Sequence, residues 1–177
     1  MPFAYYARLS ARAQTIYRQS DRVTEVSLPR PEVLRPLVEV LKLALVREDR
    51  SAVEGVANDL ASGLAEMLRV PPPVVQVLAV RPTSSWGELH GLYTTDRRRT
   101  PRIQLWMRTA RHRRVVAFRT FLRTLLHEVG HHLDYEYLGL ADSFHTEGFF
   151  RRESSLFNQL VTAEDTRSSR TRTEVGR

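Results

Sequence analysis

The chain has 177 residues, of which 42% are hydrophobic, and a formal net charge of +7. These values predict one folded domain with a short appended region and exclude disorder throughout. Cysteine is absent, which excludes disulfides, a cysteine-ligated zinc ribbon and a thiol nucleophile.

No stretch has the pattern of a signal peptide or the about 18 apolar residues of a membrane span, so we expect a cytoplasmic protein without a membrane partner. Residues 1–73 are predicted to form a helical subdomain. Amphipathic helices are expected at residues 4–19, 31–45 and 52–68, with a short strand-prone run at 23–28. The three prolines at 71–73 end this part, and we place a subdomain boundary there.

Residues 74–165 are predicted to hold a small, mainly antiparallel sheet followed by two helices. Strands are expected at residues 74–80, 89–95 and 102–108, one helix from Val115 towards Gly139, and a last helix capped by Asp142 or Ser143. In the third strand, apolar residues alternate with long polar ones that include Arg102 and Arg108, which is typical of an edge strand. Residues 166–177 are polar and aperiodic, and we expect a disordered basic tail.

Arginine dominates the positive charge, since Lys42 is the only lysine among 27 basic residues. The densest stretch, residues 97–114, contains Arg97, Arg98, Arg99, Arg102, Arg108, Arg111, Arg113 and Arg114. One interpretation is the codon usage of a GC-rich genome. The other is an anionic partner such as nucleic acid, bound through this stretch.

A histidine motif lies inside the helix predicted after Val115. His127, Glu128 and His131 form the pattern H-E-x-x-H. Residues four apart lie one above the other on a helix, so both imidazoles can bind one Zn²⁺ at about 2.0–2.1 Å. Zinc lowers the pKa of a bound water to about 7, and Glu128 is placed to take its proton as the water attacks a carbonyl. The alternative is an exposed helix that uses its histidines as ordinary polar residues.

Catalytic zinc usually has three protein ligands, so a further side chain is expected. His145 is the candidate, because it lies beyond the Gly139 turn, near the start of the next helix. Glu147 and Glu153 are the alternatives.

Other polar residues near the motif are open to more than one interpretation. Asp134, one turn beyond His131, is expected either to accept a hydrogen bond from a ligand histidine or to be a surface carboxylate. Tyr135 and Tyr137 are candidates to stabilise an oxyanion or to pack, and His90, His112 and His132 are not expected to be ligands.

These residues resemble the zincins, the metallopeptidase superfamily whose active-site helix carries H-E-x-x-H. The metzincin pattern does not fit, because Asp134 and Tyr137 stand where it needs Gly and His. The chain is most similar to the SprT-like group over about residues 74–160. Its order of residues is Thr124, Leu125, His127, Glu128, His131, His145 and Phe149, with Thr146 where that group usually has Gly. The cysteine zinc ribbon of many members is missing.

The resemblance implies an α+β zincin-like domain that hydrolyses peptide bonds of a protein or peptide with the help of zinc. A substrate strand is expected to add to the edge at residues 102–108. Two alternatives stay open: a basic, nucleic-acid-associated protein and a regulatory zincin-like protein, each with a structural or degenerate zinc site. The intact Glu128 argues against degeneration, because a structural site needs no general base.

Overall fold

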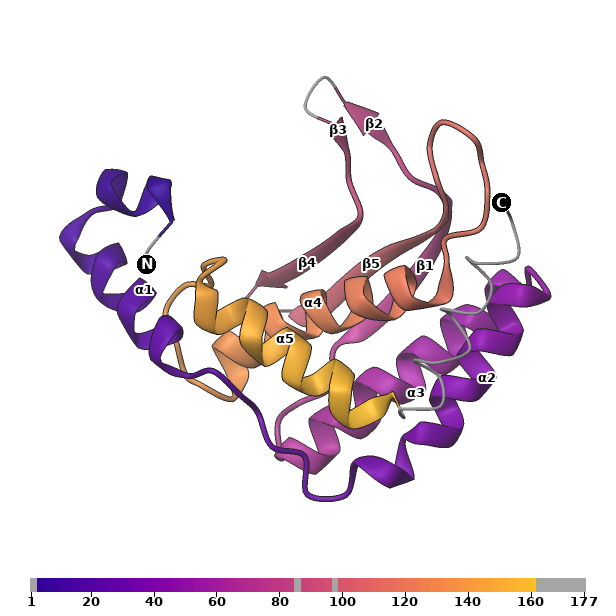
Figure 1. The fold of residues 1–177 in the computed structure, drawn as a ribbon, viewed down its shortest axis with the longest axis horizontal. Helices are drawn as coiled ribbons and strands as arrows, with labels where there is room; N and C mark the ends of the chain where they lie inside the picture. Colours follow the sequence, from indigo (N-terminus) through magenta and orange to yellow (C-terminus); the bar gives the residue numbers. More distant parts are fainter. Residues whose placement is uncertain (1–2, 85–86, 97–98, 162–177) are drawn as a thin grey trace, which may run out of the picture.

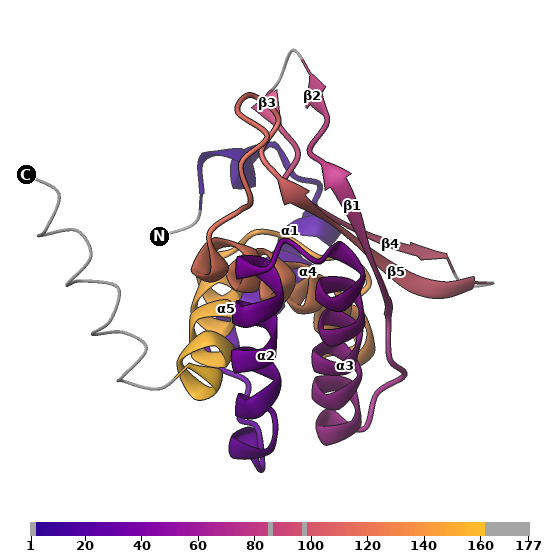
Figure 2. The same cartoon turned by 90° about the vertical axis from the view of Figure 1, so that its right-hand side faces the viewer.

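The computed structural model describes residues 3–84, 87–96 and 99–161 and shows a mixed α+β fold (Figure 1). Its helices are η1 (Ala4–Arg8), α1 (Ala11–Arg22), η2 (Pro31–Val33), α2 (Arg35–Val46), α3 (Arg50–Leu68), α4 (Phe118–Glu136) and α5 (Glu147–Leu160). Its strands are β1 (Val74–Val80), β2 (Thr83–Ser84), β3 (Gly87–Glu88), β4 (Gly91–Asp96) and β5 (Arg99–Arg108). Helices α2 to α5 lie on one side of the main sheet, as Figure 2 shows.

The main sheet has three strands in the order β1-β5-β4. Strand β1 pairs with β5 in parallel, with Val74 opposite Arg102, whereas β4 pairs with β5 antiparallel, with Gly91 opposite Leu105. The sheet is therefore mixed, not mainly antiparallel, and the strand predicted at the edge is the central one. Alternation along β5 reports only that one face is more buried than the other, and it says nothing about the number of neighbouring strands.

Side chains of α3 cover the outer edge of β1. The Asn58 amide bonds both backbone groups of Val75, at 2.7 and 2.8 Å. The Val77 N–H donates to the Glu54 carboxylate at 2.7 Å, and Arg50 donates to the Val77 carbonyl at 2.8 Å. These side chains occupy the hydrogen-bonding groups that another strand would use. Strand β4 forms the other edge of the sheet, where the Tyr93 N–H donates to the Glu128 carboxylate of α4.

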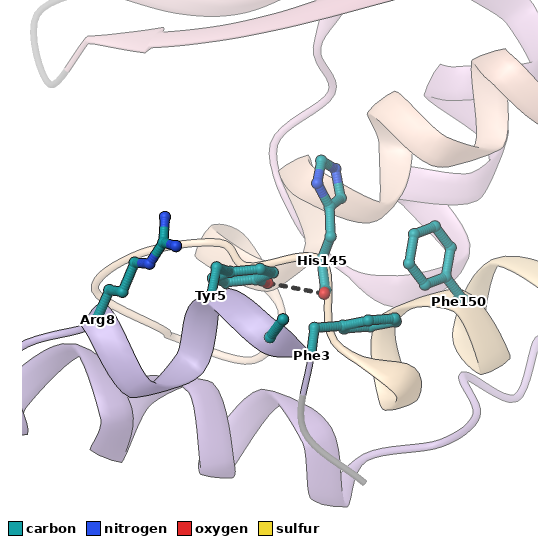
Figure 3. A pocket seen from close by; sticks show the side chains of 6 residues that line it. Phe3, Tyr5, Arg8, His145 and Phe150 are labelled. Carbon is teal, nitrogen blue, oxygen red and sulfur yellow. Dashed lines mark hydrogen bonds between the residues drawn. The ribbon is translucent and has the colours of Figure 1, made fainter.

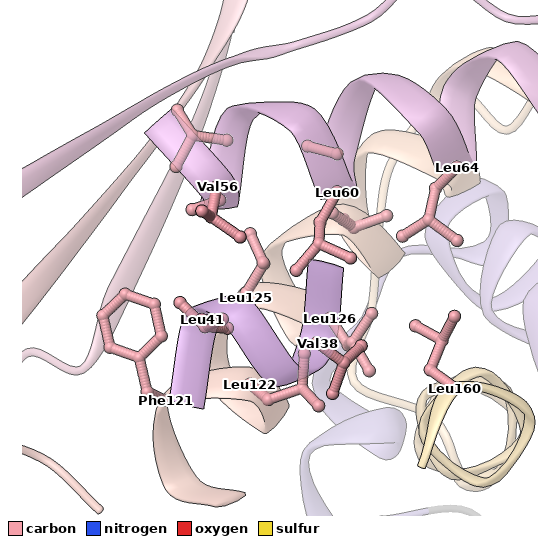
Figure 4. Packing of buried hydrophobic residues seen from close by; sticks show 14 of the residues in the cluster. Val38, Leu41, Val56, Leu60, Leu64, Phe121, Leu122, Leu125, Leu126 and Leu160 are labelled. Atoms are coloured by element: carbon pink, nitrogen blue, oxygen red, sulfur yellow. The ribbon is translucent and has the colours of Figure 1, made fainter. Parts of the chain in front are cut away.

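One hydrophobic cluster joins the two predicted subdomains. It includes Leu41 of α2, Leu60 of α3 and Leu125 of α4, which face one another in Figure 4. Burying each such side chain contributes about 1.5–3 kcal/mol. The core is thus continuous across the proposed boundary at residues 71–73, and the helical half supports the helix that carries the histidine motif.

Three local predictions were wrong. Residues 4–19 do not form one helix, because a new helix, α1, begins after Ser10, whose hydroxyl accepts from the Ala13 N–H at 3.2 Å. Residues 23–28 form no strand, because the Gln159 side chain donates to the Val26 carbonyl and accepts from the Leu28 N–H, both at 2.8 Å. Helix α5 is capped by Thr146, whose hydroxyl accepts from the Phe149 N–H at 2.9 Å, and not by Asp142 or Ser143. Thr146 is the residue immediately before the helix, so its hydroxyl reaches the first turn.

Some expectations fall on parts of the chain that the structure does not describe. The basic tail predicted at residues 166–177 lies outside the described residues, as do Arg97 and Arg98. No helix among the described residues is long and apolar enough to cross a membrane.

Candidate metal centre

Two histidines of helix α4, His127 and His131, lie against the aromatic ring of Phe149. The helix is held by apolar side chains at helical spacing, including Leu122, Leu126 and Val129, which are buried in the core. The Phe149 ring lies 4.8 Å from the His131 ring and 5.0 Å from the His127 ring, measured between centroids. A Cβ at position 130 would approach this ring to 3.1 Å, so Gly130 lets Phe149 lie close to the helix.

Three imidazoles converge on one point. His127 and His131 come from α4, and His145 comes from the segment just before α5. The Nε2 atom of His145 lies 2.9 Å from Nε2 of His127 and 3.0 Å from Nε2 of His131. The potential ligand atoms of the three residues all lie within 4.8 Å of one another, so this cluster can hold a metal ion.

The outer nitrogen of each α4 histidine has a hydrogen-bond acceptor. Nδ1 of His127 lies 3.1 Å from the Glu153 carboxylate. Nδ1 of His131 lies 2.7 Å from the Ser143 hydroxyl, which itself donates to Asp134 at 2.7 Å. Both Nδ1 atoms therefore carry the proton, and both Nε2 atoms turn a lone pair towards the centre. This is the usual arrangement of metal-binding histidines.

The donor set fits a zinc ion. Tetrahedral ligands at 2.0–2.1 Å from the metal lie about 3.3 Å from each other, close to the separations of the Nε2 atoms here. Metal binding also requires neutral imidazoles. Burial lowers the pKa of His131 to about 3, and burial likewise lowers the pKa of His145. Both rings are therefore neutral at physiological pH.

A buried ion pair links the site to the amino-terminal helix. The Arg152 guanidinium donates to Asp134 at 2.7 Å and to the carbonyls of Ser20 and Val23, at the end of α1, at 2.6 and 2.5 Å. Asp134 is fully buried and also accepts the bond from Ser143. A continuous chain of hydrogen bonds thus runs from α1 through Arg152, Asp134 and Ser143 to His131, which fixes the orientation of its ring.

Glu128 points from α4 towards strand β4. A Cβ at position 91 would lie 2.3 Å from its Oε1, so only glycine leaves room for this carboxylate. Burial raises the pKa of Glu128 to about 7, against the opposing effects of His127 and of a backbone hydrogen bond from Tyr93. A carboxylate of this kind, beside but outside the nitrogen cluster, is suited to exchange a proton near neutral pH.

A cleft of about 300 Å³ gives access to these groups. Besides the three histidines and Glu128, it is lined by Gly91, Leu92, Tyr93, Tyr135 and Ser143. Strand β4 thus forms one wall and the α4–α5 connection the other.

The other residues considered from the sequence lie outside the cluster of three histidines. His132 is fully buried, and its ring nitrogens lie 2.7 Å from the Pro71 carbonyl and 3.1 Å from the Tyr93 hydroxyl, so it joins α4 to β4 and the chain before β1. Glu147 is exposed and pairs with Arg151 at 2.6 Å. Tyr137 and His112 are exposed, and His90 lines a neighbouring pocket that also reaches His127.

Tyr93 and Arg152 help to hold the site in place through hydrogen bonds to His132 and Asp134, and the sequence did not indicate these roles. Tyr93 lies in a short strand with no motif, and Arg152 is one of many arginines. Their roles arise from long-range packing, and a pattern along the chain has no signal for it.

The arginine-rich stretch is divided by the fold. Arg99 and Arg102 line a groove with Asp96 and Gln104 at the start of β5, whereas Arg111, Arg113 and Arg114 lie in the turn beyond its end. Arg108 is paired with Glu48. The described arginines therefore form two groups at opposite ends of β5.

Three imidazole nitrogens, a buried carboxylate and a neighbouring strand edge meet in one cleft. Comparison with protein-family models, curated proteins and solved structures finds no match.

Proposed function

We propose that the chain is a zinc-dependent metallopeptidase of the zincin type, most similar to the SprT-like group. The observation that carries the proposal is the convergence of His127, His131 and His145 beside Glu128. Three protein nitrogens with a separate carboxylate are the groups that a hydrolytic zinc site needs.

Each group has a role that follows from its position. Zinc bound by the three histidines supplies a Lewis acid that lowers the pKa of a water to about 7. Glu128 accepts the proton of the attacking water and carries it towards the leaving amine, for which a pKa near 7 is well matched. Tyr135 lines the same cleft and stays the candidate for contact with the developing oxyanion.

Strand β4 replaces residues 102–108 as the expected binding edge. An extended peptide that pairs with β4 runs directly beside Glu128, since Gly91 and Tyr93 of this strand both contact its carboxylate region. The opposite edge, β1, is covered by α3. Backbone pairing with β4 brings a peptide carbonyl to the histidine cluster.

A purely structural zinc site is favoured less by these observations. Structural sites are usually closed by four protein ligands, and the cluster in the described residues has three. Burial raises the pKa of Glu128, so keeping this carboxylate in the cleft costs stability, and a purely structural zinc site has no use for the group that would offset this cost.

The proposal is tested with Glu128→Gln, which keeps the side-chain size but removes the basic carboxylate. Zinc content should match the parent, and cleavage of an unstructured protein substrate should fall by about 10²–10⁴-fold. Glu136→Gln, an exposed position on the same helix, is the matched control and should cleave like the parent. Equal cleavage by Glu128→Gln and the parent would contradict the proposal.

A further inference from the structure

A second, larger pocket opens next to the metal centre. It has a volume of about 540 Å³ and is lined by Phe3, Ala4, Tyr5, Arg8, His145 and Phe150. Figure 3 shows Tyr5 and Phe150 on either side of His145, with the Phe3 ring extending towards Phe150. His145 lines this pocket and also the cleft that holds Glu128, so the two spaces are neighbours.

Direct contacts to the third histidine hold the pocket walls. The Tyr5 hydroxyl donates to the His145 carbonyl at 2.8 Å. The Phe150 ring lies 5.8 Å from the His145 ring and is nearly parallel to it. Phe3 meets Phe150 edge to face, with ring centroids 6.0 Å apart. The segment around η1 is therefore positioned by the metal centre, although it is distant in sequence.

The pocket walls expose an unusual amount of aromatic surface. The exposed fractions of Phe3, Tyr5 and Phe150 are 41%, 36% and 41%. Three exposed aromatic rings around one concavity mark a binding site, because single exposed apolar residues are common but clusters are not. The volume also lies in the range of about 300–1,000 Å³ that is typical of ligand pockets.

We propose that this pocket is the specificity subsite that receives a large apolar side chain, aromatic or long aliphatic, next to the scissile bond of a peptide substrate. The inference rests on the proposed peptidase function and names its substrate class. Aromatic walls favour an aromatic guest, since ring pairs at these distances attract beyond simple burial. Among the described residues of the lining, Arg8 is the only charged one, so a lysine or arginine side chain is disfavoured there.

Binding is tested first, without any cleavage. Full-length protein labelled with ¹⁵N is titrated with N-acetyl-phenylalanine amide, and with N-acetyl-alanine amide as the control ligand. We expect amide shifts confined to residues 3–8 and 145–150 for the phenylalanine probe and none for the alanine probe. Phe150→Ala and Phe3→Ala should abolish the response, whereas Val46→Ala, an exposed position on α2, should keep it.

Cleavage specificity is tested second. Zinc-loaded parent is given an unstructured protein, and the cut sites are read by mass spectrometry. Large apolar residues should be enriched at one position beside the cut, and Phe150→Ala should lower kcat/KM for such sites by at least about tenfold relative to alanine-containing sites.

The two tests separate the subsite from the enzyme. If the chain cleaves without this enrichment, the subsite is overturned but the proposed function stands. The same holds if the enrichment is unchanged in Phe150→Ala and Phe3→Ala. Probe binding in the pocket of a chain that cleaves nothing supports an apolar site there and counts against the proposed function. Shifts elsewhere, or equal shifts with both probes, overturn the subsite.

Discussion

The outer nitrogens of the histidines connect the site to the rest of the protein. Glu153 holds His127 and Ser143 holds His131, so each imidazole has one tautomer and one orientation before any ion binds. Such hydrogen bonds raise metal affinity because the ligand atoms need not be reordered on binding. The sequence left Glu153 open as an alternative third ligand. In the structure its carboxylate instead lies beside Nδ1 of His127, the ring nitrogen that faces away from the other two histidines.

Ser143→Ala and Glu153→Ala should each weaken zinc affinity by about 10–100-fold while the three histidines stay in place. Competition with a chromophoric chelator measures this directly. Glu147→Ala is the control, because Glu147 is an exposed carboxylate paired with Arg151. Loss of zinc from Glu147→Ala, with no change in the other two variants, would show that a glutamate is the third ligand.

Strand β4 determines what the site can reach. Its first residue, Gly91, lies against the Glu128 carboxylate, and Gly91, Leu92 and Tyr93 line the cleft. Because Gly91 has no Cβ, β4 can lie close to α4 at this point.

Gly91→Ala should displace the Glu128 carboxylate, because the new Cβ would lie 2.3 Å from Oε1. A displacement of about 1 Å can lower catalysis by about 10²-fold, whereas zinc content should stay at the parental level. Gly55→Ala is the matched control: no atom lies within 4 Å of its added Cβ, and alanine inside a helix stabilises by about 0.5–1 kcal/mol. Parental cleavage by Gly91→Ala would contradict the placement of Glu128.

Elements fixed by local periodicity were predicted well. Residues 74–80 form β1 as expected, and α3 extends the helix predicted at 52–68 by two residues at its start. The three-residue gap between His127 and His131 is also a local feature, so their common helix face followed from the sequence. By contrast, strand order depends on pairing between distant segments, which is why β5 was wrongly placed at an edge.

The same distinction applies to the site. His145 was proposed from its position after a turn, and the structure brings it to the other histidines. Tyr93, Ser143 and Arg152 take their roles only once β4, the α4–α5 connection and α1 are packed together. Ser143 was considered only as a helix cap, because its bond to His131 needs the chain to reverse.

At the scale of the whole molecule, the positive charge of the 97–114 stretch is divided between separate places, as far as its residues are described. The described arginines of the 97–114 stretch lie at both ends of β5, and Arg108 is neutralised by Glu48. A nucleic acid bound through the whole stretch would have to reach both ends of β5, and one bound through part of it would contact a single group.

Binding of a nucleic acid through this stretch should weaken steeply with salt, because each neutralised phosphate releases counterions. Fluorescence anisotropy with labelled single- and double-stranded DNA, between about 50 and 200 mM salt, measures the slope. Replacing Arg111, Arg113 and Arg114 by serine should reduce the slope, and the same change at Arg99 and Arg102 tests the other group. Undetectable binding at about 50 mM salt would favour the codon-usage interpretation.

The central claim is that three histidines from two segments bind one zinc ion, and X-ray absorption at the zinc edge tests it most directly. The zinc-loaded chain should show three imidazole nitrogens at about 2.0–2.1 Å, and His145→Ala should show one fewer or lose the metal. His112→Ala, an exposed histidine outside the cluster, should leave the spectrum unchanged. A three-imidazole spectrum that persists in His145→Ala, or a parental spectrum without imidazole, would contradict the account.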